Sequence, residues 1–451
     1  MTTFLKFPPD FVWGAIASSY QIEGGWNEDG KGLSIWDTFV RQPGIIERGE
    51  TGNTAADHYH RWREDIELIS ELGLKSYCFS VSWPRILPEG MGKLNPAGLG
   101  FYDRLIDGLL EKGITPFIML YHWELPQALQ DKGGWGERDT AFAFAEYGRI
   151  LAQHFGDRVP LWVTHNEPMV SAILGHLTGE HAPGIKDLNV AMRAVHHLLL
   201  SHGLAVESLR AELPSAAQIS IILNLTPTYA ASEKEEDRQA ARRFDGVANR
   251  LFLDPLLRGE YSADVLEMMG AFFPPMQEGD LKIIAAPLDF LGVNYYTRAV
   301  MRYDPQVPGV QASDIHPPQS EYSQMWEIYP PGIYDLLERV WEEYHPPRIF
   351  VTENGVCVPD GVDFDGRVRD ERRIRFIRTH LAQVHRAIQA GIPVEGYFYW
   401  AWIDNFEWNF GYRMRFGLIY VDFETQKRIM KDSGRLYART IHENCFHDDV
   451  N

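Results

Sequence analysis

Eight short apolar runs recur along the whole chain, and this repetition constrains the fold more than any other feature of the sequence. Most of them lack the apolar–polar alternation of a half-exposed strand, as "ITPFIMLYH" at 114–122 illustrates. Continuously apolar strands are typical of a parallel sheet that is covered on both faces. The runs lie at residues 11–20, 75–83, 114–122, 161–168, 218–225, 289–296, 348–354 and 394–402.

Amphipathic stretches of helical length separate these runs. The stretches 58–73 and 100–113 each end at a glycine, which is a common helix terminator. Residues 370–391 carry an apolar stripe at helical spacing, formed by Ile374, Ile377, Leu381, Val384 and Ile388. Eight strands that alternate with helices predict an α/β fold, a single (β/α)8 TIM barrel with its active site at the C-terminal ends of the strands.

The alternative fold is an open, doubly wound sheet. A Gly-rich phosphate-binding turn after the first strand would favour it, and the sequence has none there. The stretch "GGWGERD" at 133–139 lacks the spacing of such a turn, so we expect a loop. Residues 303–320, which are rich in proline and serine, predict a long surface loop. Because no change in composition marks a second domain, residues 1–451 are predicted to form one catalytic barrel domain.

Charge and cysteine content limit the possible partners. The formal net charge of −19 argues against nucleic acids and anionic membranes. The start, "MTTFLKFPPD", lacks the pattern of a signal peptide, and no apolar run has the length of a membrane span. The three cysteines are widely spaced and odd in number, so neither a disulfide framework nor a zinc pattern fits. We therefore expect a cytoplasmic protein without metal or other cofactor.

Polar and aromatic residues mark the ends of the apolar runs. In a barrel these ends meet at one face, so such residues would form a polar pocket with aromatic walls. Glu167 in "WVTHNEP" and Glu353 in "VTENG" are the two carboxylates of this set. The strand-end residues, in chain order, are Gln21, His122, Asn166, Glu167, Asn294, Tyr296, Glu353 and Trp400.

Two carboxylates that face each other across a barrel can flank one scissile bond, which is the arrangement used in glycoside hydrolysis. One group protonates the leaving oxygen, and the other attacks the sugar or activates water. The residues alone leave retention and inversion both open, because the distance between the carboxylates decides the outcome. Pairing with arginine or capping of a helix is the structural alternative for each glutamate.

Four longer motifs, which occur in this order along the chain, resemble those of the family 1 glycoside hydrolases, the β-glucosidase family. The stretch 7–39, beginning "FPPDFVWGAIASSYQIEGG", resembles the N-terminal signature of that family. "WVTHNEP" resembles its acid/base motif, and "VTENG" resembles its nucleophile motif. The stretch 396–422, which contains "DNFEW", resembles its C-terminal sugar-binding block. The resemblance therefore extends from end to end of the chain.

The resemblance implies a role for each candidate residue. Glu353 would be the nucleophile and Glu167 the general acid/base of a retaining β-glycosidase that forms a covalent glycosyl-enzyme. Trp400 would stack under the non-reducing sugar, Tyr296 would donate to Glu353, and Asn294 would order the same site. Sugar hydroxyls would bond to Gln21, His122, Asn166, Glu407 and Trp408, and the pocket would be lined by Trp123, Trp326 and Phe416.

The resemblance also narrows the expected substrates to non-reducing terminal β-D-glucosyl residues, with tolerance of β-galactosides and β-fucosides. Short oligosaccharides such as cellobiose would be included, which would give the protein a part in cellulose degradation. Glu407 would repel a sugar 6-phosphate. The sulfur-glycoside members of the family lack the acid/base glutamate, whereas Glu167 is present here.

Two departures from the family pattern bear on activity. Met169 follows "NEP" where the family usually has tryptophan, on the leaving-group side. Cys78 stands where the family carries an arginine that would keep Glu353 ionised. A sugar-binding barrel with lost or weakened activity is therefore the second hypothesis. A metal-dependent barrel hydrolase is the third, but the sequence offers no ligand set for it.

Overall fold

The computed structural model describes residues 3–448, and its centre is a closed barrel of eight strands. Around the barrel the order is β11-β12-β2-β3-β4-β5-β6-β8, and every neighbouring pair is parallel. All eight predicted strands are present, each shorter than its apolar run. Their bounds are β2 Val12–Ala17, β3 Ser76–Ser80, β4 Thr115–Tyr121, β5 Leu161–Asn166, β6 Gln218–Asn224, β8 Leu291–Asn294, β11 Ile349–Asn354 and β12 Val394–Trp400.

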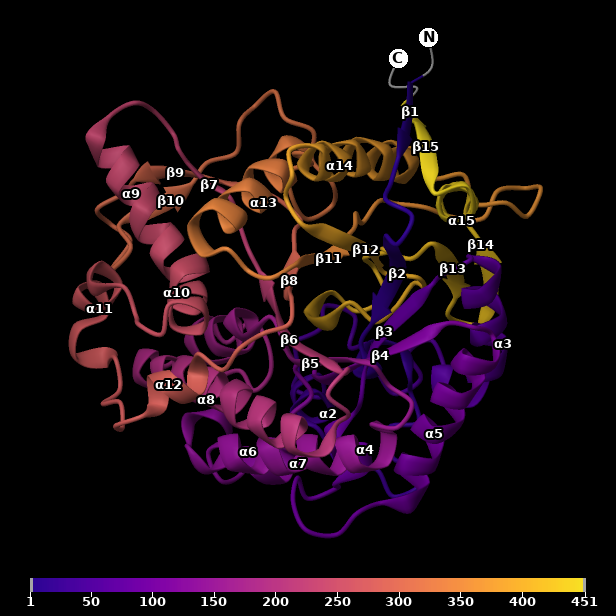
Figure 1. Ribbon diagram of the computed structural model, residues 1–451, viewed down its shortest axis with the longest axis horizontal. Helices are drawn as coiled ribbons and strands as arrows, with labels where there is room; N and C mark the ends of the chain where they lie inside the picture. The colour runs from indigo at the N-terminus through magenta and orange to yellow at the C-terminus, as the bar shows by residue number, and fades with distance from the viewer. Residues whose placement is uncertain (1–2, 449–451) are drawn as a thin grey trace.

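Helices surround this barrel, as Figure 1 shows. The three predicted helices are confirmed as α3, α5 and α14, and the apolar stripe of α14 packs against the core. The longer helices are α3 His58–Glu71, α5 Pro96–Glu111, α7 Asp139–Phe155, α8 Leu188–Glu212, α9 Glu235–Asp245, α13 Pro331–Tyr344, α14 Glu371–Gln389 and α15 Asp432–Glu443. The short helical segments are α1 Ser19–Ile22, α2 Ile35–Phe39, α4 Trp83–Ile86, α6 Gln127–Gln130, η1 Gly134–Gly136, η2 Val170–Thr178, η3 Gly246–Arg250, α10 Leu251–Leu257, α11 Ala263–Met269, η4 Gly270–Phe272, α12 Asp280–Ile284 and η5 Trp408–Phe410.

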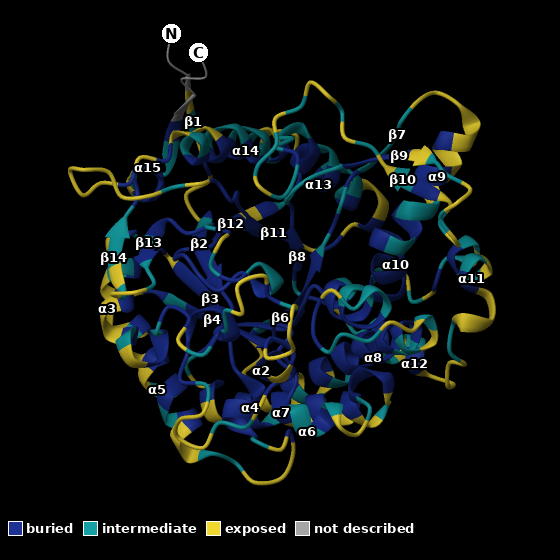
Figure 2. Cartoon of the chain, turned by 180° about the vertical axis from the view of Figure 1, so that it is seen from behind, coloured by how far each residue is buried: buried dark blue, intermediate teal, exposed yellow. Residues whose placement is uncertain are grey.

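Burial of both strand faces explains why apolar and polar residues do not alternate along the barrel strands. Figure 2 shows the barrel strands as buried, while the exposed residues lie on the outer helices and loops. One face of each strand packs against the helices, and the other faces the barrel interior, where a separate apolar cluster includes Cys78, Phe117, Phe350 and Phe398. Because both faces are covered, apolar side chains are favourable at successive positions.

Two loop predictions need correction. The segment 303–320 contains the strand β10 (Ala312–Asp314), which pairs with β9 (Ala299–Tyr303) in a small sheet completed by β7 (Thr228–Ala230). The stretch 133–139 contains η1 and ends at the first residue of α7. Both elements are short, and neither has enough residues to show a period in the sequence.

The first and the last described strands pair outside the barrel. β1 (Thr3–Lys6) runs antiparallel to β15 (Cys445–Asp448), and Figure 1 shows these two strands side by side. A two-stranded sheet, β13 (Ile419–Asp422) with β14 (Lys427–Met430), follows the last barrel strand. Among the described helices, none combines the length and apolar character that a bilayer crossing requires. The assignment of residues 1–451 to a single domain stays a prediction.

Candidate active site

The C-terminal ends of the barrel strands surround a cavity of about 330 Å³. Of the thirteen residues predicted for the site, eleven line this cavity. Gln21 and Asn166 lie one layer behind it, each bonded to residues that do line it. The eleven lining residues are His122, Trp123, Glu167, Asn294, Tyr296, Trp326, Glu353, Trp400, Glu407, Trp408 and Phe416.

Glu353 reaches the cavity as the fifth residue of β11, after an apolar and fully buried strand. Its backbone pairs with that of Asn294 on β8. The hydroxyl of Tyr296 donates to Oε2 of Glu353 at 2.6 Å. Gly355 follows, where a Cβ atom would lie 1.9 Å from the carbonyl oxygen of Trp400. The glycine therefore lets the chain pass close to the end of β12.

Glu167 directly follows β5, and its backbone adopts φ 49°. A left-handed conformation is costly for a residue with a Cβ atom, and such residues concentrate at functional sites. The backbone N–H of Glu167 donates to the carbonyl of Ile222 at 2.9 Å, which holds this turn against β6. Trp123 and Trp408, which also line the cavity, have positive φ as well.

Asn294 lies between the two glutamates. Its side-chain amide donates to Oε1 of Glu167 at 2.7 Å and to Oδ1 of Asn166 at 3.1 Å. Its side-chain oxygen Oδ1 accepts from the hydroxyl of Thr352 at 2.8 Å. Thr352 directly precedes Glu353 in the chain. One side chain on β8 thus fixes the ends of β5 and β11 relative to each other.

A second group of polar residues comprises Glu407 and His122, which line the cavity, and Gln21 and Asn166, which lie behind them. Gln21 donates to Oε2 of Glu407 at 3.3 Å, and its own oxygen Oε1 is buried without a partner among the described residues. Asn166 donates to Nε2 of His122 at 3.2 Å, and Trp123 donates to the carbonyl of Asn166 at 3.0 Å. Donors and acceptors that share one small volume suit sugar hydroxyls, which need both.

Aromatic rings form the walls. The ring of His122 stacks on Trp400 with centroids 5.6 Å apart and an interplanar angle of 28°. In a second aromatic group of the lining, the ring centroid of Trp326 lies 5.0 Å from that of Tyr296 and 6.2 Å from that of Phe416. The apolar face of a pyranose ring can pack on surfaces of this kind.

Three buried carboxylates share this cavity, and burial raises the pKa of each. The pKa of Glu167 is raised to about 7 and that of Glu407 to about 8. The pKa of Glu353 is raised well above its usual range by burial and by the charge of Glu167, against the hydrogen bond from Tyr296. Because like charges at close range oppose joint ionisation, the three carboxyl groups together retain at least one proton near neutral pH.

Cations do not compensate these carboxylates. Burial lowers the pKa of His122 to about 3, so that ring is neutral. Of the described residues that line the cavity, none is a lysine or an arginine. The described residues also contain no group of three or more His, Cys, Asp or Glu side chains that could hold a metal ion.

Cys78 lies on β3 inside the barrel and is fully buried. The pKa of its thiol is raised first by burial and then by the charge of Glu353, which places the thiol within electrostatic reach of that carboxylate. The departure noted in the sequence therefore lies in the barrel interior, within electrostatic reach of the predicted nucleophile.

Two arginines that could have replaced the missing charge are engaged elsewhere. Arg85 forms a buried ion pair with Glu23 at 3.0 Å, and Arg413 pairs with Glu47 at 2.8 Å on the surface. Among the described residues, no lysine, arginine or histidine forms an ion pair with Glu353. The carboxylate is supported by hydrogen bonds alone.

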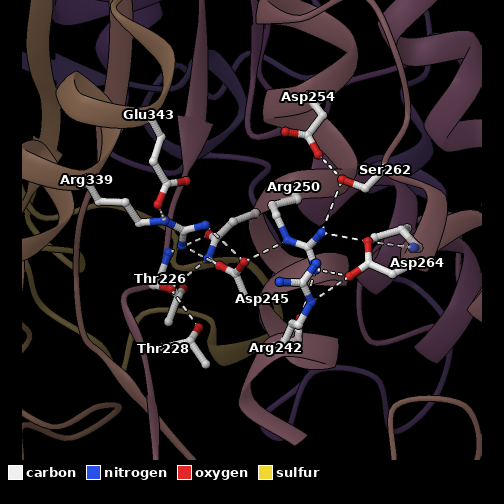
Figure 3. A network of polar contacts seen from close by, with 12 residues as sticks. Thr226, Thr228, Arg242, Asp245, Arg250, Asp254, Ser262, Asp264, Arg339 and Glu343 are labelled. Carbon is white, nitrogen blue, oxygen red and sulfur yellow. Dashed lines mark hydrogen bonds and ion pairs between the residues drawn. The ribbon is translucent and has the colours of Figure 1, made fainter. Parts of the chain in front are cut away.

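A network of arginines and aspartates lies beside the site, at α9, η3, α11 and α13 (Figure 3). Asp245 accepts from Arg250 and Arg339, and Arg250 also donates to Asp264 at 2.8 and 3.0 Å. These buried and half-buried groups compensate one another, so the network is structural.

This network also positions one wall of the cavity. Asp245 accepts from Asn249 at 2.7 Å. Asn249 in turn accepts from the N–H of Thr226 and donates to the carbonyl of Thr226, both at 2.9 Å. Because Thr226 lines the cavity, the arginine–aspartate network fixes the segment after β6 at the site.

The sequence missed several lining residues. Val170 and Leu174 belong to the π-helix η2, Phe410 is the last residue of η5, and Met325 lies in a loop. Their only signal was proximity in the chain to the predicted residues Glu167, Trp326 and Trp408. Met169 lines the cavity as well, and its predicted place on the leaving-group side stays a prediction.

Comparisons with known proteins identify the same family over nearly the full length of the chain. Residues 4–446 match the model of a family described as glycosyl hydrolase family 1. Beta-glucosidase A of Thermotoga maritima is 50% identical over 98% of this chain and 99% of its own length. The bifunctional beta-D-glucosidase/beta-D-fucosidase of Bifidobacterium breve is 42% identical over 97% of this chain and 98% of its own length. A solved structure of the family 1 β-glucosidase from T. maritima in complex with isofagomine lactam has a TM-score of 0.96 at 50% identity, covering 98% of this chain and 100% of that chain.

Proposed function

Because the chain belongs to glycosyl hydrolase family 1 and is a retaining β-glucosidase, we propose that Glu353 is its nucleophile and Glu167 its general acid/base. The observation that carries the assignment is the joint placement of the two carboxylates. They lie at the ends of β5 and β11, and Asn294 and Tyr296 hold them in one cavity. No observation supports the alternative that Cys78 has abolished activity.

In the first step, Glu353 attacks the anomeric carbon of the sugar. The bond between that carbon and the leaving oxygen breaks, and the proton of Glu167 passes to the leaving oxygen. In the second step, Glu167 accepts a proton from water, and the water oxygen attacks the anomeric carbon. The ester bond to Glu353 then breaks, which restores the free carboxylate and the β configuration.

The proposed substrates are unphosphorylated β-glucosides, including short oligosaccharides such as cellobiose, with β-fucosides and β-galactosides as further substrates. The hydrogen-bonding groups at Glu407 and His122 support a neutral sugar in the cavity. Cleavage of cellobiose would place the protein in cellulose degradation. A cytoplasmic location would keep its three free cysteines reduced.

Proton NMR of the first product tests the proposed mechanism. Two successive inversions at the anomeric carbon release β-glucose, which then mutarotates slowly. The β-anomer signal should therefore appear first with an aryl β-glucoside as substrate. Initial release of the α-anomer would rule out Glu353 as a nucleophile.

A further inference from the structure

A second cavity, of about 850 Å³, lies among α9, α10, α11 and α13, which Figure 1 shows outside the barrel strands. No described residue lines both this cavity and the one that contains Glu167 and Glu353. Thr226 lines the first cavity and Thr228 the second, so the segment between β6 and β7 borders both. We call the second site the arginine cavity because five arginines line it: Arg238, Arg242, Arg250, Arg258 and Arg339.

The charge of the arginine cavity is opposite in sign to that of the whole chain. Five guanidinium groups line it together with three carboxylates, Asp245, Asp264 and Glu343, whereas the formal net charge of the protein is −19. Hydrogen bonds from Arg250 and the positive charges of Arg250 and Arg242 outweigh burial and lower the pKa of Asp264 to about 2. This cavity therefore favours negative charge, in contrast to the cavity of the three glutamates, where the pKa values are raised.

Two of the five arginines have no guanidinium nitrogen to spare, as Figure 3 shows. Arg250 donates to Asp245 through Nε and to Asp264 through both Nη atoms. Arg339 donates to Asp245 through both Nη atoms and to Glu343 through Nε. These two arginines hold the three carboxylates in place, so a ligand of the cavity would be bound by the other three.

Arg242 and Arg258 are each held by part of the guanidinium group and have donors left over. Arg242 donates to Asp264 through Nε at 2.9 Å, while its Nη1 and Nη2 have no hydrogen-bond partner among the described residues. Arg258 donates to Asp254 through Nη1 at 3.2 Å and stacks on Tyr344, 4.3 Å from the ring centroid. Its Nε likewise lacks a partner among the described residues. Both groups are therefore positioned before a ligand arrives.

Arg238 is held only by exposed carboxylates. It pairs with Glu233, whose side chain is 96% exposed, and its Nη1 lies 3.9 Å from Glu235. Exposed ion pairs of this kind contribute little free energy. A more highly charged anion in the cavity can therefore take these donors at little cost.

A phosphate group fits these donors better than other anions do. Guanidinium groups donate in a planar fork that matches the oxygens of phosphate and carboxylate. A phosphate monoester carries three terminal oxygens and close to two negative charges at pH 7, so several arginines can bind it at once. A carboxylate has two oxygens and a single charge. A nucleic acid strand would be repelled by the net charge of −19 around the cavity.

We propose that the arginine cavity binds the phosphate group of a small phosphorylated metabolite, and that Arg238, Arg242 and Arg258 donate to its oxygens. The volume leaves room for the organic part of such a molecule beside the alanines of the lining, Ala230, Ala241 and Ala263. The site is separate from the active site, and the phosphate ester is bound and released unchanged.

Isothermal titration calorimetry with glucose 6-phosphate tests the proposal. The active site is first blocked with the sugar mimic deoxynojirimycin, at a concentration that stops hydrolysis of an aryl β-glucoside. The titration is made near neutral pH at low ionic strength, because salt screens exposed charges. We expect saturable binding of one glucose 6-phosphate per chain and no binding of glucose. Absence of saturable binding, or equal binding of glucose, would overturn the proposal.

Variants identify the arginine cavity as the place of binding. Arg242→Gln and Arg258→Gln each remove charge-assisted hydrogen bonds and should weaken the binding of glucose 6-phosphate by about tenfold or more. Arg242→Lys keeps the charge and should lose less than Arg242→Gln. Arg375→Gln is the matched control, because Arg375 is an exposed arginine that pairs with Glu321 and does not line the cavity. Unchanged affinity in both glutamine variants of the cavity would contradict the assignment.

Inorganic phosphate separates recognition of the phosphate group from recognition of the sugar. If the arginines bind the phosphate group, inorganic phosphate should displace glucose 6-phosphate from the wild type. Failure of this competition would overturn the proposal, since the organic part would then be what the site recognises. Hydrolysis of the aryl β-glucoside should be unchanged in Arg242→Gln and Arg258→Gln, which shows that a loss of phosphate binding is not a loss of folding.

Discussion

The hydroxyl of Tyr296 donates a 2.6 Å hydrogen bond to Oε2 of Glu353, while Oε1 of the same carboxylate is buried without a partner among the described residues. Only one of the two oxygens of the Glu353 carboxylate therefore accepts a hydrogen bond from a described residue. Burial and the nearby Glu167 favour the protonated form of Glu353, and only hydrogen bonds favour the anion that must attack. Cys78 lies within electrostatic reach and contributes no charge that would help.

Replacing Cys78 with arginine should therefore improve the nucleophile. A guanidinium beside Glu353 would lower its pKa by about 1–3 units. Since Glu353 attacks as the anion, the acidic limb of the kcat/KM profile should move to lower pH by a similar amount, and kcat/KM at neutral pH should rise. Cys78→Met, which adds volume without charge, is the control. Superimposable pH–rate profiles for Cys78→Arg and wild type would show that the cysteine is a silent replacement.

Glu167→Ala should discriminate between leaving groups. Poor leaving groups such as alkoxides need a proton when the bond breaks, so their kcat/KM should fall by about 10²–10⁴-fold. An activated dinitrophenyl glucoside should lose far less, whereas Glu353→Ala should abolish hydrolysis of both. Glu180→Ala, at the exposed mouth of the cavity, should leave the ratio between substrates unchanged. Equal losses for both substrates in Glu167→Ala would contradict its role as the acid.

The enzyme should reject glucosides that carry a 6-phosphate. The cavity is lined by Glu167, Glu353 and Glu407, and no described lysine or arginine lines it. A phosphate dianion there would be desolvated without a counter-charge, which is strongly unfavourable. We expect kcat/KM for 4-nitrophenyl 6-phospho-β-glucoside to be at least about 10³-fold below that for the unphosphorylated compound. Comparable kcat/KM values for the two glucosides would refute the prediction that Glu407 in "DNFEW" excludes phosphorylated sugars.

Glu407 should make the stability of the free enzyme depend on pH. Burial raises its pKa to about 8, above the value of about 4.5 in an unfolded chain. The resulting stabilisation is complete below the unfolded value and is lost as pH rises through the folded value, by up to about 1.4 kcal/mol per pH unit. Glu407→Gln removes this ionisation. In urea titrations, the free energy of unfolding of Glu407→Gln should therefore increase relative to that of wild type as the pH rises from 5.5 to 8.5.

The exposed substitution Glu111→Gln is the control for that comparison, and it should follow the wild type at every pH. A constant difference between wild type and Glu407→Gln across the pH range would show that Glu407 does not titrate in this window.

The sequence alone was sufficient for the barrel and for the two glutamates. All eight strands were predicted because a strand that is covered on both faces must be apolar along its length, and this is visible in a few consecutive residues. Glu167 and Glu353 were visible for the same reason, since each interrupts such a run at the point where the strand meets the cavity.

Tertiary structure decided what surrounds those glutamates. The cavity lining brings together Leu174 and Met325, which are far apart in the chain, and no local pattern in the sequence records this arrangement. The left-handed backbone of Glu167 and the position of Gln21 behind Glu407 likewise depend on packing between strands. The proton affinity of Glu353 also could not be inferred from the sequence. It is set by burial and by neighbours from other strands, so it exists only once the barrel has closed.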